Sequence, residues 1–574
     1  MSKKIISFCA LVAIIGCDQK PEQAPADLIL WHGKIVTMDA SVPEAEALAV
    51  VGNKIVAVGT DAEIQPYVGS DSRIIDLKGM LAIPGLIEGH GHYMSLGESL
   101  MELELRHTRT WQEIVKLVES AVDKAEPGDW IIGRGWHQNK WVRPPTPAVE
   151  GLPVHQELSK VSTENPVLLI HTSGHGVFVN ALALELAGIS KNTPNPSGGE
   201  IVRDSQGNAT GMLREAAQDT VRAVMARHRS QRLPEVIEAE RRRQVQLAGE
   251  NALANGITSF QDMGSTFETI DLLKKMAEEG NLSVRLYIAI EEPSAKMVDR
   301  LESYRTVGYC NGFLTVRTIG ENVLDGALGT HGGWLLEPYS DMPRTSGLIV
   351  TPIEEIRRYA ELAVKHDYQL AIQGIGDRAA RTLFDIYEET FKNNPQKQDW
   401  RWRIEHAQVI HPDDLPRFAE LGVIAGIQGI FACSDGPWVI DRLGEQRARE
   451  RGYIFRSMIE SRAITMNGTD PPVEDIDPLA SIHCAITRKL PDGSLFFPEQ
   501  SMTREQALRS YTINNAYAAF EEKIKGSLTP GKLADITVLS KDIMAIPEDE
   551  ILNTEIIYTI VGGVLKYEKA LEKG

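Results

Sequence analysis

Two histidines stand one residue apart at the end of an apolar run, in Met80-Leu-Ala-Ile-Pro-Gly-Leu-Ile-Glu-Gly-His-Gly-His92. On an extended chain, residues two apart point to the same side. Both imidazoles, His90 and His92, can therefore reach one metal ion from the end of a strand. Two surface histidines in a loop can share this spacing, but the preceding buried-strand pattern with Pro84-Gly85 favours the metal site.

Two further candidates also end apolar runs. His406 follows Trp402–Ile404, and Asp470 follows Ile464–Asn467 before a Pro-Pro break. A single histidine is more often a core or surface residue, and such an aspartate is more often a helix cap or an Asx turn. Together, however, the imidazoles and the carboxylate form a ligand set that suits zinc, iron or manganese.

A metal in such a site would bring the pKa of bound water to about 7, which supplies hydroxide near neutral pH. Asp470 is the candidate to hold that water and take its proton. The sequence therefore predicts hydrolytic chemistry.

The elements that must position these side chains alternate along the chain. Strand-like apolar runs and helical patterns succeed one another, which is typical of an α/β fold with a parallel sheet. A closed barrel of such units places its chemistry at the carboxyl ends of the strands. The expected strands are Met80–Ile87, Pro166–Ile170, Ile257–Gln261, Val284–Ile290, Leu370–Gly374, Trp402–Ile404, Val423–Ile427 and Ile464–Asn467, and the expected helices are Trp111–Lys124, Leu233–Asn255, Ile353–His366 and Arg504–Phe520.

Both ends of the chain are β-rich instead. Short strands are expected at Leu28–Thr37, Ala47–Val51, Lys54–Val58, Arg73–Asp76, Ala534–Leu539 and Ile556–Tyr567, the last with Gly562-Gly563 as a hairpin turn. Gly and Asn turns separate these runs. Two such ends around a long α/β centre predict a small β-domain built from both termini.

The N-terminal segment resembles an export signal. Lys3 and Lys4 precede an apolar run, Ile5 to Gly16, that is too short to span a bilayer comfortably. Because the run ends at Cys17, a bacterial lipoprotein signal is favoured over an ordinary cleaved signal, although Ile14 stands where Leu is usual. Residues 18–26 are polar and proline-rich, as a tether would be. We expect an exported protein, periplasmic or anchored to a bacterial membrane by lipid.

Composition narrows the classes of partner and site. The formal net charge of −19 argues against nucleic acid, whose phosphates need a basic surface. The five cysteines are scattered without a CxxC pair, so neither a disulfide framework nor a thiolate zinc site is expected. A small-molecule substrate remains as the expected partner, membrane contact would be through the lipid anchor alone, and a homo-oligomer is left open.

Long stretches of the chain resemble the amidohydrolase superfamily, in the branch that contains N-substituted formamide deformylase and the YtcJ-type proteins. The resemblance runs from about residue 27 to residue 567. The matching stretches are PGLIEGHGH (84–92), WIIGRGWHQNKW (130–141), NPVLLIHTSGH (165–175), DGALG (325–329), LLEPYSD (335–341), GIGDRA (374–379), RIEHAQ (403–408), YTINNAYAAFEE (511–522) and KGSLTPGKLADITVL (525–539).

The resemblance implies an α/β fold: a TIM-type (β/α)8 barrel with an insertion after the first strand, plus a small β-sandwich from both chain ends. The implied division is a leader at 1–17, a tether at 18–26, sandwich segments at 27–83 and 525–570, and a hydrolase barrel at 84–524. The family's metal ligands fall on His90, His92, His406 and Asp470. Its pocket histidine in SGH falls on His175, and Trp136 is assigned to the substrate pocket, with packing as the alternative.

Three positions depart from the family pattern. Relatives often carry a lysine, carboxylated to bridge two metals, where this chain has Glu321. Glu321 is a candidate ligand, with a nearby hydrogen-bonding role as the alternative. Gln373 replaces the histidine of HAIGDRA, and Phe431 replaces the histidine of QPxHxxSD. These changes favour one ion over two and reshape the substrate pocket.

The sequence thus predicts a metal-dependent amidohydrolase that cleaves amide-type, non-peptide C–N bonds with one divalent ion, zinc first and iron or manganese as alternatives. The catalytic residues would be Asp470, His406 and His175. Two other functions stay open. One is a catalytically impaired ligand-binding lipoprotein, which Gln373 and Phe431 motivate, and the other is an ester or lactone hydrolase on the same centre.

Overall fold

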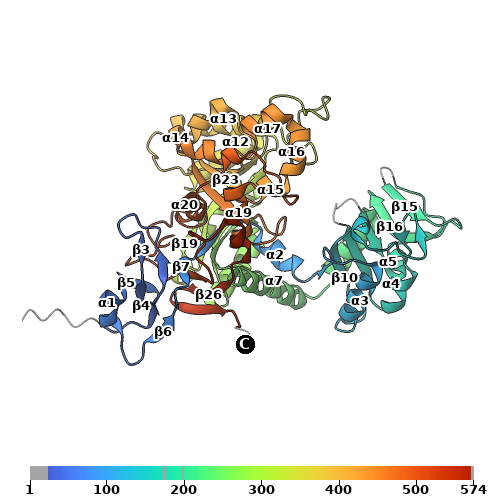
Figure 1. The fold of residues 1–574 in the computed structure, drawn as a ribbon. Helices are drawn as coiled ribbons and strands as arrows, with labels where there is room; N and C mark the ends of the chain where they lie inside the picture. The colour runs from blue at the N-terminus through green and yellow to red at the C-terminus, as the bar shows by residue number, and fades with distance from the viewer. Residues whose placement is uncertain (1–23, 172–175, 197–198, 571–574) are drawn as a thin grey trace, which may run out of the picture.

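The computed structural model describes residues 24–171, 176–196 and 199–570. A central barrel, a β-domain at the base and a laterally placed inserted domain make up the molecule (Figure 1). Among the described helices, none combines the length and the apolar character needed to cross a bilayer.

Eight parallel strands form the barrel. They are β8 (Leu86–Gly91), β17 (Ile257–Ser265), β18 (Arg285–Ile290), β20 (Leu314–Val323), β21 (Gln369–Gly374), β22 (Arg403–His406), β23 (Ile424–Gln428) and β24 (Ile464–Gly468), adjacent in this order. The first and last meet at their carboxyl ends, because Asp470 N donates to His90 O at 3.0 Å and His92 N to Pro471 O at 2.9 Å. The near-closed barrel confirms the predicted fold class.

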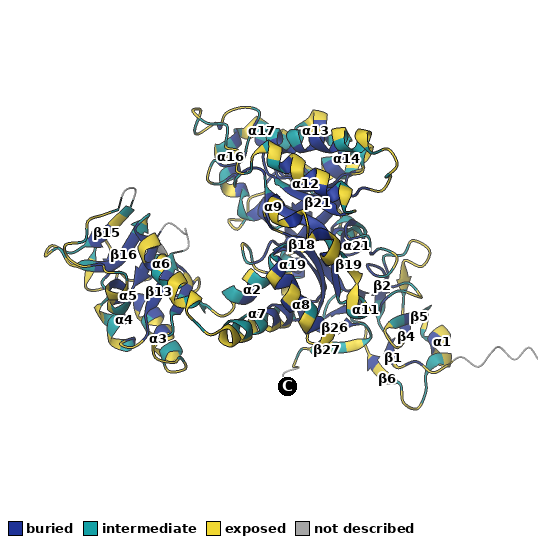
Figure 2. Ribbon diagram, turned by 180° about the vertical axis from the view of Figure 1, so that it is seen from behind, coloured by how far each residue is buried: buried dark blue, intermediate teal, exposed yellow. Residues whose placement is uncertain are grey.

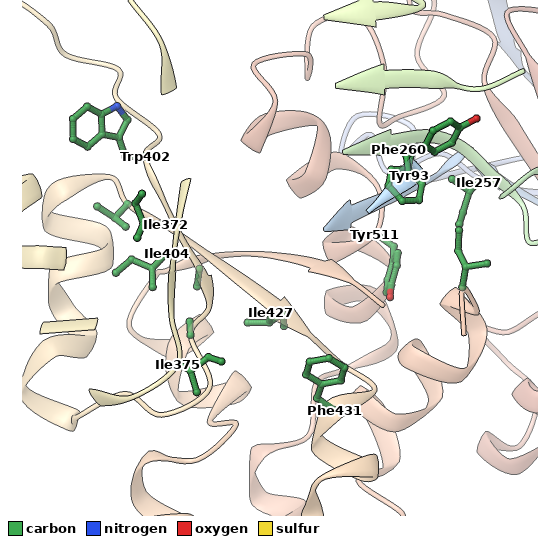
Figure 3. Close-up of a cluster of buried hydrophobic side chains, with 14 of the residues drawn as sticks. Tyr93, Ile257, Phe260, Ile372, Ile375, Trp402, Ile404, Ile427, Phe431 and Tyr511 are labelled. Atoms are coloured by element: carbon green, nitrogen blue, oxygen red, sulfur yellow. The ribbon is translucent and has the colours of Figure 1, made fainter. Parts of the chain in front are cut away.

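Helices cover the outside of the barrel. They include α8 (Phe267–Glu278), α12 (Ile353–Lys365), α13 (Asp377–Asn393) and α14 (Leu415–Leu421). Ile372 and Ile404, paired across β21 and β22, belong to the buried layer drawn in Figure 3. Because side chains alternate along a strand, their neighbours Gln373 and Glu405 point to the barrel interior.

One predicted barrel strand was wrong. Residues 166–170 belong to β13 (Val167–His171) of the inserted domain, and the barrel takes β20 instead, which the apolar pattern missed. Arg317 and Glu321 interrupt the apolar run of β20. Glu321 lies at the predicted metal-binding rim. A residue placed there for function therefore interrupts the apolar pattern by which the strand could have been recognised.

The predicted strand Met80–Ile87 is two strands. β7 (Leu81–Pro84) pairs with β25 (Ile536–Leu539) of the end domain, and β8 starts the barrel after Gly85. A Cβ at Gly85 would lie 2.2 Å from Thr258 Oγ1, so the passage between the two sheets requires a glycine here.

The two chain ends build the β-domain as predicted. One sheet has the order β5-β4-β1-β6, and the other, β27-β26-β25-β7-β2-β3, mixes strands from both ends. Their bounds are β1 (Leu28–Trp31), β2 (Lys34–Val36), β3 (Glu44–Ala45), β4 (Ala47–Val51), β5 (Lys54–Gly59), β6 (Arg73–Asp76), β26 (Ile556–Val561) and β27 (Val564–Glu568). The hairpin turn at Gly562-Gly563 is confirmed, with positive φ at both glycines.

The predicted helices are mostly present. Trp111–Val122 (α3), Pro234–Ala254 (α7) and α12 match within a few residues. The helix expected at Arg504–Phe520 is broken into α20 (Arg504–Ser510) and α21 (Ile513–Ala518), because Thr512 leaves helical geometry at φ −128° and ψ −97°.

The inserted domain lies between α2 (Tyr93–Ser99) and α7 and stands to one side of the barrel (Figure 1). Its sheet has the order β15-β16-β14-β13-β10-β9, with strands Gly199–Arg203, Ala209–Glu215, Gly176–Val179, Val167–His171, Ile131–Trp136 and Leu103–Glu104. It has its own clusters of buried hydrophobic residues, and in one of them Trp111, Trp136 and Phe178 pack together. Figure 2 shows buried segments within this domain as dark blue ribbon.

A disulfide joins Cys433 and Cys484, with Cα atoms 6.0 Å apart. It connects α15 (Phe431–Ser434), which follows β23, to α19 (Pro478–Thr487), which follows β24. The expectation of no disulfide framework was therefore wrong for this pair. Their separation of 51 residues leaves no local spacing signal, and only the fold brings them together.

Candidate metal centre

Five side chains converge at the carboxyl rim of the barrel: His90, His92, Glu321, His406 and Asp470. His90 Nε2 lies 3.4 Å from Glu321 Oε2 and 3.6 Å from Asp470 Oδ1. His92 Nε2 lies 3.3 Å from Asp470 Oδ1, and His406 Nε2 lies 3.2 Å from Glu321 Oε1. All but the partly exposed His92 are buried.

Facing side-chain atoms at this rim have no hydrogen bond among the described residues. They are His90 Nε2, Glu321 Oε1 and Asp470 Oδ1. The second ring nitrogen of His406, Nδ1, is also buried without a partner, while its Nε2 faces Glu321. Buried polar atoms normally have a partner, and so many orphans in one place need an explanation. Three imidazoles and two carboxylates are ligands for a divalent ion such as zinc, so the residues fit a metal.

The possible ligands form two overlapping groups that share His90. One is His90, His92 and Glu321, and the other is His90, His406 and Asp470, with the ligand atoms of each group within 4.8 Å of one another. The structure thus places Glu321 among the possible ligands rather than at a distance from them. The predicted preference for one ion over two stays a prediction.

Charges within the cluster stabilise one another. Burial disfavours the protonated form of His90, but Glu321, Glu405 and Asp470 outweigh it and raise the pKa of His90 well above its usual value. Burial likewise disfavours ionised Glu321, yet His90 and His406 hold its pKa well below the usual range. The carboxylates of this cluster therefore favour a positive charge beside them, and the imidazoles favour the ionised form of Glu321.

Glu405, which the sequence analysis did not single out, contacts His90 at the ring nitrogen that faces away from the metal centre. Its Oε2 lies 2.7 Å from His90 Nδ1, and its Oε1 accepts from Arg403 Nε at 2.5 Å. Glu405 and Arg403 are fully buried. A carboxylate on the far nitrogen fixes the imidazole so that Nε2 faces the metal side. The adjacent His406 also reaches the cluster because its positive φ of 66° turns the chain.

Glu88 is a second residue that sequence reasoning missed. Its carboxyl accepts from Thr469 N at 2.6 Å and from Thr469 Oγ1 at 3.1 Å. Burial raises the pKa of Glu88 to about 8, although these bonds oppose the rise. Glu88 thereby ties β8 to the turn that carries Asp470, whose φ is 59°. No pattern in the sequence marks this contact, which links residues 381 positions apart.

Asp325 organises the neighbouring loops. Its carboxylate accepts from the backbone N–H groups of Trp334, Ile375 and Gly376 at 2.7–2.9 Å. Gln373 donates from Nε2 to Asp325 O. Gln373 thus bonds to the loop after β20, while its assignment to the substrate pocket stays a prediction.

The other predicted pocket residues lie in different places. Phe431 stacks on His406 with ring centroids 6.2 Å apart, so it contacts the metal cluster. Trp136 lies in the inserted domain, where Nε1 donates to Leu169 O at 3.0 Å and the ring stacks on Trp141. His175 lies outside the described residues. The structure therefore groups Phe431, but not Trp136, with the metal ligands.

A cavity of about 540 Å³ lies between the base of the inserted domain and the loop after Asp470. Its walls include Glu102, Arg134 and Glu474. Arg106 of the inserted domain donates to Asp475 of that loop at 2.9 Å. The cavity thus borders the loop that follows Asp470 of the metal centre. Its walls come from the inserted domain and from the barrel.

Comparisons with known proteins agree with this geometry. A model of the amidohydrolase family matches residues 73–567, and the chain belongs to that family. It is a metal-dependent hydrolase of the amidohydrolase superfamily with a buried metal site of His, Asp and Glu.

Three relatives match nearly the whole chain. It is 33% identical to the protein LONG AFTER FAR-RED 3 of Arabidopsis thaliana, over 95% of this chain and 92% of that protein. It is 29% identical to the putative amidohydrolase YtcJ of Bacillus subtilis, over 94% and 99%. It is 27% identical to the N-substituted formamide deformylase of Arthrobacter pascens, over 95% and 98%.

A solved structure supports the fold independently. An uncharacterized metal-dependent hydrolase from Pyrococcus furiosus superimposes with a TM-score of 0.72 at 26% identity, covering 90% of this chain and 99% of that one. The resemblance inferred from the sequence motifs is thereby confirmed.

Proposed function

We propose that this protein hydrolyses amide-type, non-peptide C–N bonds of small molecules with one divalent ion, zinc in the first place. The observation that carries the proposal is the convergence of five ligand-type side chains, among which His90, Glu321 and Asp470 have facing atoms without a hydrogen-bond partner. The name of the Arthrobacter relative, a deformylase of N-substituted formamides, supports a C–N bond as the target.

In this proposal the ion supplies Lewis acidity and an activated water. His90, His92 and Asp470 would hold it, with Glu321 and His406 as further ligands. Asp470, whose Oδ1 lies 3.3 Å from His92 Nε2, would take the proton of the water that adds to the carbonyl carbon and return it to the nitrogen as the C–N bond breaks. Glu405 keeps His90 oriented, and Phe431 packs on His406 to exclude water from that side.

We also propose that the protein is exported. The leader ending at Cys17 and the Cys433–Cys484 disulfide support this, because disulfides persist in oxidising compartments.

The test is metal analysis of the purified protein together with hydrolysis of N-benzylformamide. We expect close to one equivalent of a divalent ion, loss of activity on chelation, and recovery when zinc is restored. His92→Ala should lose both ion and activity, while His228→Ala, on the exposed face of α6 (Gln218–Ser230), should keep both. A protein that never binds metal would favour the ligand-binding alternative, and activity on benzyl formate alone would favour an ester hydrolase.

A further inference from the structure

We infer that the side-chain amide of Gln428 is a substrate-binding group that recognises an N–H donor beside an oxygen acceptor. The inference rests on the proposed function and narrows it, because it assigns the substrate class as amides that carry an N–H. Gln428 is the last residue of β23, at the carboxyl rim of the barrel.

The strand geometry places Gln428 at the level of the metal centre. A Cβ on Gly426 would lie 2.5 Å from Glu405 Oε2, so Gly426 faces the barrel interior beside the carboxylate that holds His90. Residues two apart on a strand share a face, so Gln428 points inward one step nearer the rim. Its paired neighbour on β24, Gly468, faces His90 and Glu88.

Two neighbouring strands carry metal-centre residues on either side of Gln428. β22 ends at His406, and β24 leads to Asp470. The side chain of Gln428 is only 2% exposed, and neither Nε2 nor Oε1 has a hydrogen-bond partner among the described residues. A buried amide with both ends unpaired is rare in a folded protein and calls for a partner.

Two other buried glutamines in the barrel show the contrast. Gln261 donates to Asn515 O and accepts from Arg403 Nη1. Gln369 donates to Ala518 O and accepts from Tyr287 and Thr318. Both amides hold the fold together, whereas the amide of Gln428, nearer the rim, is free for a ligand.

A glutamine amide offers one acceptor and two donor hydrogens. Its complement is a group with an N–H for Oε1 and an oxygen for Nε2 on the same side, which a secondary amide provides in its cis rotamer. An ester of the same shape has the oxygen but not the N–H. A site built to hydrogen-bond an N–H strongly rejects an analogue that lacks it. The position of Gln428 therefore favours amides over esters at this centre.

The first experiment compares Gln428→Met with the wild type on matched substrates: N-benzylformamide, N-benzyl-N-methylformamide and benzyl formate. We expect Gln428→Met to lower kcat/KM for N-benzylformamide by about 10²-fold or more. The two probes without an N–H should change by no more than a few-fold. An equal loss on all three would overturn the inference while leaving the proposed function in place.

If the wild type cleaves none of these probes, that result counts against the proposed function. The second experiment needs no substrate, so it tests the role of Gln428 in that case as well. Thermal unfolding of the metal-loaded protein is compared for Gln428→Met, Gln261→Met and Gln369→Met. We expect Gln428→Met to keep or raise Tm, because it removes an unpaired buried amide, and the two controls to lower it by several degrees. A drop for Gln428→Met as large as theirs would show a structural amide and overturn the inference.

Discussion

The barrel rim and the inserted domain bury polar and aromatic groups in opposite ways. At the rim, histidines and carboxylates from the ends of four strands, β8, β20, β22 and β24, face one another with atoms left unpaired. In the inserted domain, Trp136 is buried with its indole N–H bonded to Leu169 O and its ring packed on Trp141 and Phe178. The rim gathers several unpaired ligand-type atoms in one place, whereas packing and one backbone hydrogen bond account for the burial of Trp136, although the buried indole N–H of Trp141 beside it has no partner.

This difference separates binding from packing as reasons for burying a residue. Unpaired buried atoms destabilise a fold unless a ligand completes them, so several of them on histidines and carboxylates gathered in one place mark a functional region. The aromatic cluster needs no ligand, because its rings cover one another. If the comparison is right, changes at the rim should act mainly on metal binding and activity, and changes in the inserted domain mainly on local stability.

The largest expected effect is on catalysis at the rim. Asp470→Asn should lower kcat/KM for N-benzylformamide by about 10³-fold or more, because the amide cannot take the proton from water. The fold should remain, as judged by circular dichroism. Asp492→Asn, in an exposed turn, is the matched control and should leave the rate unchanged. Retained activity in Asp470→Asn would remove this residue from the mechanism.

The next effect concerns the support beneath the metal centre. Glu405→Gln leaves Arg403 as an uncompensated buried charge, so the free energy of unfolding should fall by about 3–5 kcal/mol. Urea denaturation measures this. The control is Glu389→Gln, whose exposed pair with Arg357 should contribute less than about 1 kcal/mol. If both variants lowered the free energy of unfolding by the same small amount, the buried pair of Glu405 and Arg403 would not stabilise the rim.

Trp136→Ala probes the inserted domain. Loss of a buried indole there should reduce stability by about 3–5 kcal/mol. Hydrogen exchange should rise within β10, β13 and β14, while metal content stays at the wild-type level. If the variant loses its metal as well, the two regions unfold together and the proposed separation between them fails.

The disulfide near the rim should have a moderate effect. It closes a loop of about fifty residues, so Cys433→Ser with Cys484→Ser should lower the free energy of unfolding by about 2–4 kcal/mol. The serine variant should match reduced wild type. Unchanged stability after reduction would show that packing alone holds α15 against α19.

The smallest effect is a pH dependence at Asp435, whose carboxylate accepts from Tyr453 Oη at 2.5 Å. Burial raises the pKa of Asp435 to about 6, above an unfolded value of about 3.9. Protonated Asp435 therefore makes its full contribution to the free energy of unfolding below about pH 4. This contribution is lost as the pH rises through 6. Relative to wild type, Asp435→Asn should gain in Tm from pH 4 to pH 7.

Asp492 provides a control of opposite sign for this experiment. Hydrogen bonds from Ser494 lower the pKa of Asp492, so its contribution is present above the unfolded pKa and is lost as pH falls. Asp492→Asn should therefore lose in Tm relative to wild type as pH rises from 3 to 5. A flat difference for Asp435→Asn across pH 4–7 would contradict its raised pKa.

Much of the fold could be predicted because periodicity is local. The strands before His90, His406 and Asp470, the helix at residues 111–122 and the hairpin at Gly562-Gly563 all follow from residue patterns within a short window. β20 could not be predicted in this way, since Glu321 and Arg317 break its apolar run. The helix break at Thr512 likewise has no local signal.

The sequence alone determined which residue types stand at the strand ends, and hence that His90, His92, His406 and Asp470 were metal candidates. Only the tertiary structure decided that Glu321 joins them, that Glu405 and Glu88 support them, and that Cys433 meets Cys484. The physical reason is distance along the chain: these contacts join residues from 51 to more than 300 positions apart, and only the arrangement of the strands in the barrel brings them together. Whether a buried amide is paired, as in Gln261, or unpaired, as in Gln428, is also decided by those long-range neighbours.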